Sequence, residues 1–565
     1  MLKNKKSQSL IQLALFFGII VFVNILSSYI YKSADLTEEG RFTLTQPTKE
    51  LMDEIDDILY IQVLLDGDFP AGFKRLQTAT KELLDDFRSV NGNVEYEFLN
   101  PGEGTIQEVN ERKKVLANDG IIPTVLRVKQ IDETVEQIIY PWAIINYKGR
   151  SVPINLLENE ALGVSDEVIL NNSVSLLEYK FTSGITRVRT TKKPAILFTT
   201  GHGELEAIQT LDLHRAIYKK YNVGQINLDS IIQIADQVKT LVIAKPKTRF
   251  TSRDKFLIDQ YVMRGGNVMF LIDQLGVNLD SLRMLPRFIP RENNLGLEDM
   301  LFNYGVKVKP NLILDLECTQ IPLVTGQLGD GPQYDFFPWY YHPVVAPTSA
   351  HPIVKNLERI NFQFPSSIDT FRTKTPIKKT VILTSSKYTK LQRTPIELNF
   401  EILRQKPKED FFNKPPQPIA VLLEGVFPSL YENRVPQQML EGLESMGQQY
   451  VSKGKPAKML VVSDGDVVRN LIVDMETQKV KTLGFNPYDK RIYGNKNFII
   501  NALEYLIDNS GVMESRSKEV KLRMIDTTRA RTEKTKWQVV NIVLPLVFLL
   551  TFGFLYNYVR RRKYG

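Results

Sequence analysis

The sequence has few of the residues from which metal centres and covalent catalytic sites are built. Cys318 is the only cysteine among 565 residues, so no intrachain disulfide and no cysteine-cluster zinc or iron–sulfur site can form. It lies in LECTQIP, without the glycine-rich elbow that a nucleophilic thiol needs, so we interpret it as a buried or incidental thiol. The four histidines form no HExxH pair, and Gly-x-Ser-x-Gly and GxxxxGK[ST] are absent. We therefore predict no metal, no cofactor and no catalytic residue.

Positive charge is concentrated at the two ends of the chain. The net charge is +8, and Lys3, Lys5, Lys6 and residues 560–563 supply seven of these charges. The other 65 Lys and Arg nearly balance the 64 Asp and Glu. Basic patches interleaved with aromatic residues, which nucleic-acid binding requires, are not evident, so we expect no nucleic-acid partner.

Two long apolar runs lie beside these basic tails. Residues 10–31 (LIQLALFFGIIVFVNILSSYIY) and 538–558 (QVVNIVLPLVFLLTFGFLYNY) contain no charged side chain, and each is long enough to cross a bilayer as a helix. The alternative is a buried core helix. An A-x-A-like cleavage site does not follow the first run, so we interpret both runs as transmembrane helices.

Two spans place both termini on the same side of the membrane. The positive-inside rule predicts cytoplasmic tails and places the 506 residues 32–537 outside the cytoplasm. Residues 511–537 carry eight Lys and Arg against four Asp and Glu, which argues for the opposite orientation. If the loop is nevertheless outside the cytoplasm, this basic stalk could hold it close to anionic lipid headgroups. The alternative is that the stalk is a solvated linker helix.

The first part of the loop alternates helical and strand patterns. We expect helices at 47–55, 73–90 and 107–118, and strands at 58–65, 94–99, 124–129, 137–147 and 150–156. This order is close to a thioredoxin-like layer, but the reactive CxxC is absent, so the layer would be a scaffold.

The second part predicts a larger α/β domain. Strands are expected at 195–199, 240–244, 267–272, 312–314, 380–383, 419–423 and 459–462, and helices at 204–221, 253–264 and 496–508. Apolar strands that alternate with helices indicate a mostly parallel, doubly wound sheet. Segments 326–365 and 392–446 are rich in Pro, Gly and aromatic residues and are expected to be insertions.

These patterns divide the chain into seven segments. They are a cytoplasmic tail (1–9), a transmembrane helix (10–31), a thioredoxin-like domain (32–190), a larger α/β domain (191–510), a basic stalk (511–537), a second transmembrane helix (538–558) and a cytoplasmic basic tail (559–565).

Several polar residues follow predicted strands at one edge of the larger sheet. The candidate ligand residues are Gly201, His202, Gly203, Glu204, Asp273, Asp464 and Asp466. A strand-to-helix turn at the first four would suit an anion, and the acids together could hold a divalent cation. The alternative, which we favour, is that the glycines shape the turn, Glu204 stabilises a helix N-terminus and the aspartates are ordinary turn residues.

Residues 334–343 read YDFFPWYYHP, a segment with six aromatic side chains between prolines that should stop regular structure. The candidate surface consists of Tyr334, Phe336, Phe337, Trp339, Tyr340 and Tyr341. It could present a stacking surface for sugars or a protein partner, or fold back to fill the space between two domains. The sequence supports both interpretations about equally.

Several motifs together carry a family resemblance over nearly the whole chain. They are the N-terminal apolar run, RFTLTQPTKELM, AILFTTGHGELE, LVIAKPKTRFTSRDKFLIDQYVMRGGNVMFLIDQ, FPWYYHP, VVSDGD, NKNFIINALEYLID and the C-terminal run. The sequence resembles the GldG family, the auxiliary, so-called substrate-binding components of the gliding-motility ABC transporter of Bacteroidota. The GHGE and GGNV patterns also resemble a domain shared with intraflagellar transport proteins, related to amidotransferase-like α/β folds without their catalytic residues.

The resemblance implies a non-catalytic, periplasm-facing subunit in the inner membrane that works with a GldF-like permease and a GldA-like ATPase. Membrane lipid is a further expected partner, and a homo-oligomer is left open. No catalytic residue carries over from the family. The alternatives are a structural scaffold of the gliding or secretion machinery, docked through the aromatic segment, and an enzyme that uses the acids at the sheet edge.

Overall fold

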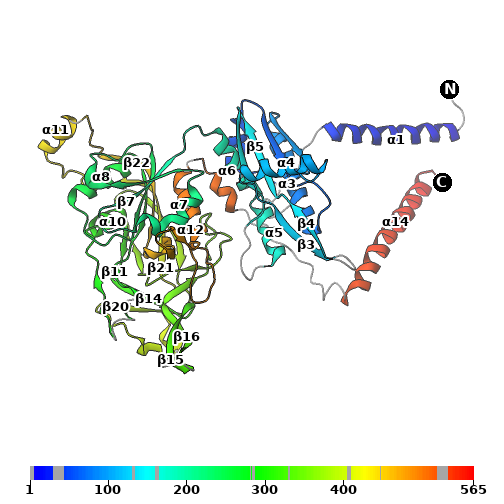
Figure 1. Ribbon diagram of the computed structural model, residues 1–565. Coiled ribbons are helices and arrows are strands. Elements are labelled where there is room, and N and C mark those ends of the chain that lie inside the picture. The colour runs from blue at the N-terminus through cyan, green and yellow to red at the C-terminus, as the bar shows by residue number, and fades with distance from the viewer. Residues whose placement is uncertain are drawn as a thin grey trace. The chain divides into compact units, whose positions relative to one another are not determined.

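The computed structural model describes residues 5–29, 43–129, 134–158, 165–279, 282, 287–328, 331–403, 407, 409–445, 447–508, 510–517 and 532–564. Internal contacts divide the chain into two units, Met1–Lys518 and Glu519–Gly565. The first unit contains the sheets described below, and the second contains the helix α14 (Lys534–Tyr564) (Figure 1). The predicted mixed α/β class is confirmed.

A four-stranded sheet forms the N-terminal part of the first unit. Its strand order is β2 (Val94–Phe98), β1 (Leu59–Val63), β5 (Trp142–Tyr147), β6 (Arg150–Asn155). β1 pairs with β2 in parallel and with β5 in antiparallel orientation, and β5 and β6 form a hairpin. The two-residue turn of this hairpin, at Lys148 and Gly149, has positive φ at both positions, as the tight turn of a hairpin requires.

Helices cover both faces of this sheet, and the side chains of its central strand β5 point alternately into two cores. Ala143 and Ile145 of β5 point into a core that also holds the apolar sides of α2 (Gln46–Asp53), α3 (Ala71–Val90) and α6 (Leu177–Arg189). The intervening residues of β5 pack toward Leu116 of α4 (Ile106–Asn118). The period of two along the strand thus determines which helix each side chain meets.

Gly184 allows α6 to lie directly on the sheet. A Cβ atom at this position would lie 2.6 Å from Cδ1 of Ile145 and 2.8 Å from Cγ2 of Ile154. Such contacts are too short for a larger residue, so glycine sets the close spacing between α6 and the hairpin of β5 and β6. This spacing matters because α6 and β6 also form one wall of the cavity described below.

A seven-stranded sheet forms the larger part of the first unit. Its strand order is β19 (Ile377–Thr384), β21 (Pro418–Pro428), β22 (Lys453–Val462), β10 (Asn267–Leu271), β9 (Val238–Ala244), β7 (Ala195–Thr200), β8 (Asn222–Asn227). The strands from β22 to β8 run parallel, as the sequence predicts, while β21 and β19 are antiparallel to their neighbours.

The larger sheet also has a core on each face. Val242 and Ala244 of β9 pack with α7 (Leu211–Ile217) and α12 (Asn495–Ile507), whereas Leu241 and Ile243 pack with α8 (Ser252–Met263) and α10 (Glu298–Tyr304). Burial on both faces explains why strands such as β10 read as continuous apolar runs. Figure 1 shows these elements in green and orange.

Two predicted elements of the chain have different bounds from those expected. The single strand predicted at 137–147 is two strands, β4 (Thr134–Ile139) and β5, which pair in different sheets. Pro141 lies at the break because proline cannot donate a hydrogen bond to a neighbouring strand. The helix predicted at 204–221 is reduced to a 3₁₀ turn, η1 (Ala207–Thr210), and the short α7, and it is followed by the unpredicted strand β8.

Another predicted strand lies outside the seven-stranded sheet. Residues 312–314 belong to β14 (Asn311–Asp315), which pairs with β20 (Thr389–Arg393) in a separate two-stranded sheet. The sequence of an apolar strand does not show which sheet the strand joins. In β14 the pairing partner lies about 80 residues further along the chain, and tertiary packing brings the two strands together.

Both terminal apolar runs are helical. α1 (Lys5–Tyr29) contains residues 10–29 of the first run, whose last two residues lie outside the described residues, and α14 contains the second run. Among the described residues, Lys534–Arg562 is the one helix long and apolar enough to cross a membrane, and the apolar part of α1 is shorter, Leu13–Asn24. The N-terminal span, and with it the two-span topology, therefore stays a prediction.

The predicted stalk begins inside the folded body. The 3₁₀ helix η6 (Val512–Ser517) contacts α2 and α6, and Val512 and Met513 are buried in the core of the four-stranded sheet. Residues 518–531, which form most of the predicted stalk, lie outside the described residues. The chain therefore returns from the larger sheet to the smaller one before it reaches α14.

Candidate functional site

The carboxyl ends of the parallel strands bring charged side chains together at one edge of the larger sheet. Lys245 follows β9, Asp273 follows β10, and Asp464 and Asp466 follow β22. The Lys245 Nζ lies 3.1 Å from Asp273 Oδ2 and also contacts Asp466 Oδ2. The ammonium group thus occupies the position between the carboxylates that a bound cation would take.

Backbone amides use most of the remaining carboxylate oxygens in this cluster. The Gly465 N–H donates to Asp273 Oδ1 at 2.5 Å, and the two oxygens of Asp464 accept from the N–H groups of Asp466 and Gln363 at 2.7 Å each. We call Lys245, Asp273, Asp464 and Asp466 the charged edge. Because its groups satisfy one another, little bonding capacity is left for a ligand.

Burial and mutual repulsion set the pKa values at the charged edge. Burial and the neighbouring carboxylates Asp273 and Asp466 raise the pKa of Asp464 well above its usual range. Burial also raises the pKa of Asp273, although Lys245 opposes this effect. For Asp466 burial acts in the same direction, but Lys245 and Arg469 outweigh it and lower the pKa. Asp466 is thus the carboxylate that carries the counter-charge of Lys245.

The turn that follows β7 forms a separate network around His202. Its main-chain N–H donates to Glu204 Oε2 at 2.6 Å, and its ring nitrogens lie 3.3 Å from Glu204 Oε1 and 3.2 Å from Asp254 Oδ2. The imidazole also stacks on Phe250, with ring centroids 3.8 Å apart. Although burial lowers the pKa of His202, the hydrogen bonds to the two carboxylates outweigh it and raise this pKa.

The glycines of this turn serve backbone geometry. Gly201 and Gly203 have φ values of 108° and 76°, which side-chain-bearing residues rarely adopt. The main-chain oxygen of His202 accepts hydrogen bonds from the N–H groups of Lys247 and Thr248. The turn therefore connects the loop after β9 to the end of β7. The first α-helix after the turn, α7, begins only at Leu211.

The seven candidate ligand residues thus lie in two networks. The structure brings Asp273, Asp464 and Asp466 together, whereas the side chain of Glu204 faces His202. In the described part of the chain, no group of three or more His, Cys, Asp or Glu side chains is arranged to hold a metal ion. Sequence reasoning missed Lys245, which directly follows β9, whereas Asp273 and Asp464 are the second residues after their strands.

The aromatic segment is a strand, contrary to the expectation that its prolines would interrupt regular structure. β16 (Gly331–Val345) pairs with β15 (Cys318–Leu328) in a long antiparallel hairpin, and Pro338 and Pro343 lie within it. Proline is tolerated in such a strand where its nitrogen faces away from the ladder. In Figure 1 the hairpin extends below the rest of the green part of the chain.

Burial divides the aromatic residues of this hairpin into two groups. Trp339, Tyr340 and Tyr341 are at most 4% exposed and pack in a core cluster, while Tyr334 and Phe336 are 55% and 52% exposed. Phe337, between the two groups, is half-buried. Trp339, Tyr340 and Tyr341 therefore belong to a core, whereas a binding role for the exposed Tyr334 and Phe336 stays a prediction.

Cys318, at the start of β15, has the properties of an unreactive thiol. Burial, together with the nearby Asp315, raises its pKa to about 12. A thiol with such a pKa remains protonated near neutral pH, so it is a poor nucleophile.

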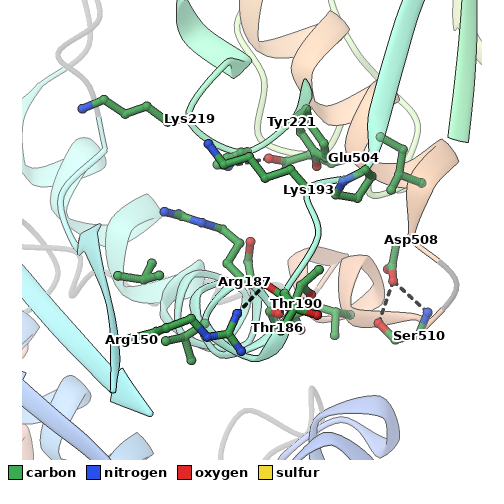
Figure 2. A pocket seen from close by; sticks show the side chains of 18 of the residues that line it. Arg150, Thr186, Arg187, Thr190, Lys193, Lys219, Tyr221, Glu504, Asp508 and Ser510 are labelled. Atoms are coloured by element: carbon green, nitrogen blue, oxygen red, sulfur yellow. Dashed lines mark hydrogen bonds and ion pairs between the residues drawn. The ribbon is translucent and has the colours of Figure 1, made fainter. Parts of the chain in front are cut away.

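A cavity of about 710 Å³ lies between elements of the two sheets within the first unit. One wall comes from β6 and α6, with Val152 and Arg187, and the other comes from α12 and the segment after α7, with Glu504 and Tyr221 (Figure 2). The volume is in the range of small-molecule sites. The residues that line the cavity are scattered along the sequence, and no sequence motif identifies them.

Positive charge predominates in the lining of this cavity. The charged lining residues are Arg150, Arg187, Lys193, Lys219, Lys220, Glu504 and Asp508. Lys220 and Glu504 form an ion pair at 2.5 Å, and Asp508 accepts hydrogen bonds from Ser510 and from the N–H of Met513. For Glu504, burial would raise the pKa, but Lys220 and the hydroxyl of Tyr179 outweigh it and lower the pKa.

The other four basic groups have no carboxylate partner among the described residues. Arg150 donates to the main-chain oxygens of Arg189 and Thr190 at 2.8 and 2.7 Å, and Lys193 reaches the oxygen of Tyr218 at 3.4 Å. Neither a hydrogen bond nor an ion pair links the Arg187 and Lys219 side chains to another described residue. Burial lowers the pKa of Arg187, although the charge of Glu504, which is not bonded to it, opposes this effect.

Comparisons with known proteins place most of this architecture in a family. Residues 193–502 match the family described as "ABC-type uncharacterized transport system" (ABC_transp_aux), and residues 38–146 match "Domain of unknown function (DUF7088)". The search of curated proteins gave no match.

Three solved structures are similar at low sequence identity. The N-terminal domain of mmIFT52 is 11% identical, with a TM-score of 0.30, over 55% of this chain and 96% of that one. The exo-β-1,4-mannosidase Op5Man5 from Opitutaceae bacterium strain TAV5 is 10% identical, with a TM-score of 0.21, over 53% and 35%. A protein described as ThuA-like from Parabacteroides merdae is 11% identical, with a TM-score of 0.25, over 56% and 90%.

The first family match extends over more than half of the chain. It begins just before β7, ends within α12 and so includes the whole seven-stranded sheet and the charged edge. The chain therefore belongs to the family of auxiliary components of ABC-type transport systems.

Proposed function

We propose that this protein is a non-catalytic, two-span auxiliary subunit of an ABC transporter, with its sheets in the periplasm and both termini in the cytoplasm. The family match over residues 193–502 carries this proposal. The charged edge supports it, because the place where an open α/β sheet usually binds its substrate is filled by Lys245 and its carboxylate partners. The cytoplasmic ATPase would supply the energy.

Within this proposal the transporter is of the gliding-motility type, with a GldF-like permease and a GldA-like ATPase. The sequence motifs shared with the GldG family support this assignment. The strand order β2-β1-β5-β6, with β5 antiparallel to the others, supports a thioredoxin-like layer at 32–190. The doubly wound sheet supports an amidotransferase-like layer at 191–510.

Affinity purification of the tagged full-length chain from native membranes tests the assembly. We expect a permease and an ATPase to be enriched, as identified by mass spectrometry, compared with an unrelated tagged two-span protein from the same membranes. Recovery of the chain without either subunit, in a mild detergent that keeps other ABC transporters intact, would contradict the proposal.

The single cysteine allows a sharp test of topology. In a Cys318→Ser background, Lys81→Cys places one thiol on the exposed face of α3, and Arg561→Cys places one in the C-terminal tail. A membrane-impermeant maleimide should label the first in intact spheroplasts and the second only after permeabilisation. The reverse pattern would place the sheets in the cytoplasm, which the basic stalk favours.

A scaffold role is the second candidate, and the exposed half of the β15–β16 hairpin favours it. Tyr334, Phe336 and Val324 expose more than half of their surface there. The double variant Tyr334→Ser/Phe336→Ser tests docking without disturbing the core, unlike changes at the buried Trp339. Loss of partner assembly with intact ATPase activity would support a scaffold, and loss of transport with intact assembly would support a substrate-handling surface.

A further inference from the structure

The cavity in Figure 2 combines two features that a chain rarely retains without a ligand. One is a set of basic groups in excess of the acids that could neutralise them, and the other is a wall of apolar side chains around those groups. The lining contains five basic and two acidic side chains, and one of the acids is already paired with Lys220. The local charge is therefore positive even though the loop as a whole is nearly neutral.

Arg187 is the central group of this arrangement. It lies on α6, and Figure 2 shows its side chain extending from the helix into the open middle of the cavity. A guanidinium group presents a planar set of N–H donors that match the oxygens of a carboxylate or phosphate. In Arg187 none of these donors is used by another described residue, whereas those of nearby Arg150 bond main-chain oxygens.

The apolar walls restrict the ligand further. Val152 and Pro153 of β6, Val188 of α6 and Ile507 of α12 line the cavity together with the rings of Tyr179 and Tyr221. A free inorganic anion would leave this surface uncovered. A volume of about 710 Å³ accommodates a molecule with an apolar body as well as an acidic group.

We propose that this cavity binds a small molecule that carries a carboxylate or phosphate group on an apolar body. Arg187 holds the acidic group, and the side chains of β6, α6 and α12 hold the body. The molecule contacts elements of both sheets, so its binding stabilises one arrangement of the two sheets. This inference goes beyond the proposed function and does not depend on it, because the site is formed by this chain alone.

Binding is tested with the full-length protein in phosphatidylcholine nanodiscs, without permease or ATPase, by isothermal titration calorimetry. The probes are 4-(1-pyrenyl)butanoate, its neutral amide and inorganic phosphate. We expect one butanoate per chain, at least tenfold tighter binding than for the amide, and competition by phosphate at high concentration. The variant Arg187→Gln should weaken butanoate binding at least tenfold.

Arg372→Gln is the matched control, because Arg372 is exposed, lies outside the cavity and has no bonded partner among the described residues. It should bind the butanoate as the wild type does. Equal affinity for acid and amide, or unchanged binding by Arg187→Gln, would overturn the proposal. Because Arg187→Gln removes an unpaired charge, a preserved thermal midpoint shows that weaker binding is not caused by unfolding.

A second arm distinguishes a membrane lipid from a soluble molecule. Nanodiscs that contain phosphatidylglycerol replace the phosphatidylcholine discs in the same titration. Displacement of the butanoate, lost in Arg187→Gln, supports the site and identifies an anionic lipid as its occupant. Unchanged butanoate binding supports the site and identifies a soluble acid.

Discussion

The charged edge and the cavity differ in whether their charged side chains are paired with opposite charges. At the charged edge one lysine lies among three carboxyl groups, and backbone N–H groups and the Arg469 guanidinium bond the oxygens that the lysine does not reach. In the cavity four basic groups have no carboxylate partner among the described residues, and Arg187 is bonded to nothing in that part of the chain. The charges of the charged edge are therefore neutralised by residues of the chain itself, whereas the basic groups of the cavity remain available to an acidic ligand.

The cost of burying charge explains this difference. An ionised group removed from water is tolerated only where it is paired and hydrogen-bonded. Lys245 is nearly buried, with 13% of its side chain exposed, so its partners must come from the chain itself. Arg187 is half-buried beside a cavity, so water can solvate it when the cavity is empty and a ligand can replace that water.

Replacing Lys245 should produce the largest effect, because it leaves the carboxylates of the charged edge without their counter-charge. We expect Lys245→Met to lower the free energy of unfolding by about 3–5 kcal/mol at pH 7.5, as measured by denaturant unfolding. Protonation of the raised-pKa groups Asp273 and Asp464 relieves the repulsion, so the loss should shrink as the pH falls toward 5.

Lys247→Met is the control for this change, since Lys247 is an exposed lysine two residues away. It should change the unfolding free energy by no more than about 0.5 kcal/mol. If both variants lost the same small amount of stability, the charged edge would not be a balanced cluster.

The His202 network should show an intermediate, pH-dependent effect. The two carboxylates raise the pKa of His202, so its cationic form stabilises the fold fully below its unfolded pKa of about 6.5. That contribution is lost as the pH rises through the raised folded pKa. His202→Gln should therefore cost on the order of 1–3 kcal/mol at pH 6 and clearly less at pH 9, measured by unfolding at both values.

His214→Gln provides the matched comparison. Burial lowers the pKa of His214 and so disfavours its cationic form in the fold, and the cost of replacing it should therefore not decrease from pH 6 to pH 9. A cost for His202→Gln that did not change between pH 6 and pH 9 would mean that the charge of His202 does not support the turn.

Arg187 should show the smallest effect on stability and the opposite sign. Arg187→Gln removes a partly desolvated cation whose side chain makes no hydrogen bond or ion pair among the described residues and which Glu504 stabilises only from a distance, so the unfolding free energy should stay within about 0.5 kcal/mol of the wild type or rise. Thermal unfolding in the same nanodiscs measures this effect. A loss comparable to that of Lys245→Met would show that Arg187 holds the fold together and would remove the contrast between the two regions.

Much of the sheet edge could be predicted because parallel strands end on the same side. The apolar runs of β9, β10 and β22 identified these strands, and acids that follow strands of this kind converge at one edge. Lys245 was missed because a lysine after a strand also reads as an ordinary turn residue. Only its contacts to Asp273 and Asp466 in the folded chain reveal its role.

The hairpin and the cavity were harder to infer for a different reason. The prolines of YDFFPWYYHP suggested interrupted structure, whereas the pairing of β15 with β16 accommodates them. Which aromatic residues are buried depends on where the strand enters the core at Trp339. The residues of the cavity lie between positions 150 and 513, and their proximity follows from how the two sheets are joined.

The sequence by itself determined the mixed α/β class, the parallel strands, the basic tails and the apolar terminal helices, because these follow from local periodicity and composition. The tertiary structure alone decided which charges neutralise one another. Pairing depends on distances of a few ångströms between residues far apart in the chain, and the desolvation that makes pairing necessary depends on burial. A chain whose loop is nearly neutral in sum therefore contains one region that is balanced internally and one that retains positive charge for a ligand.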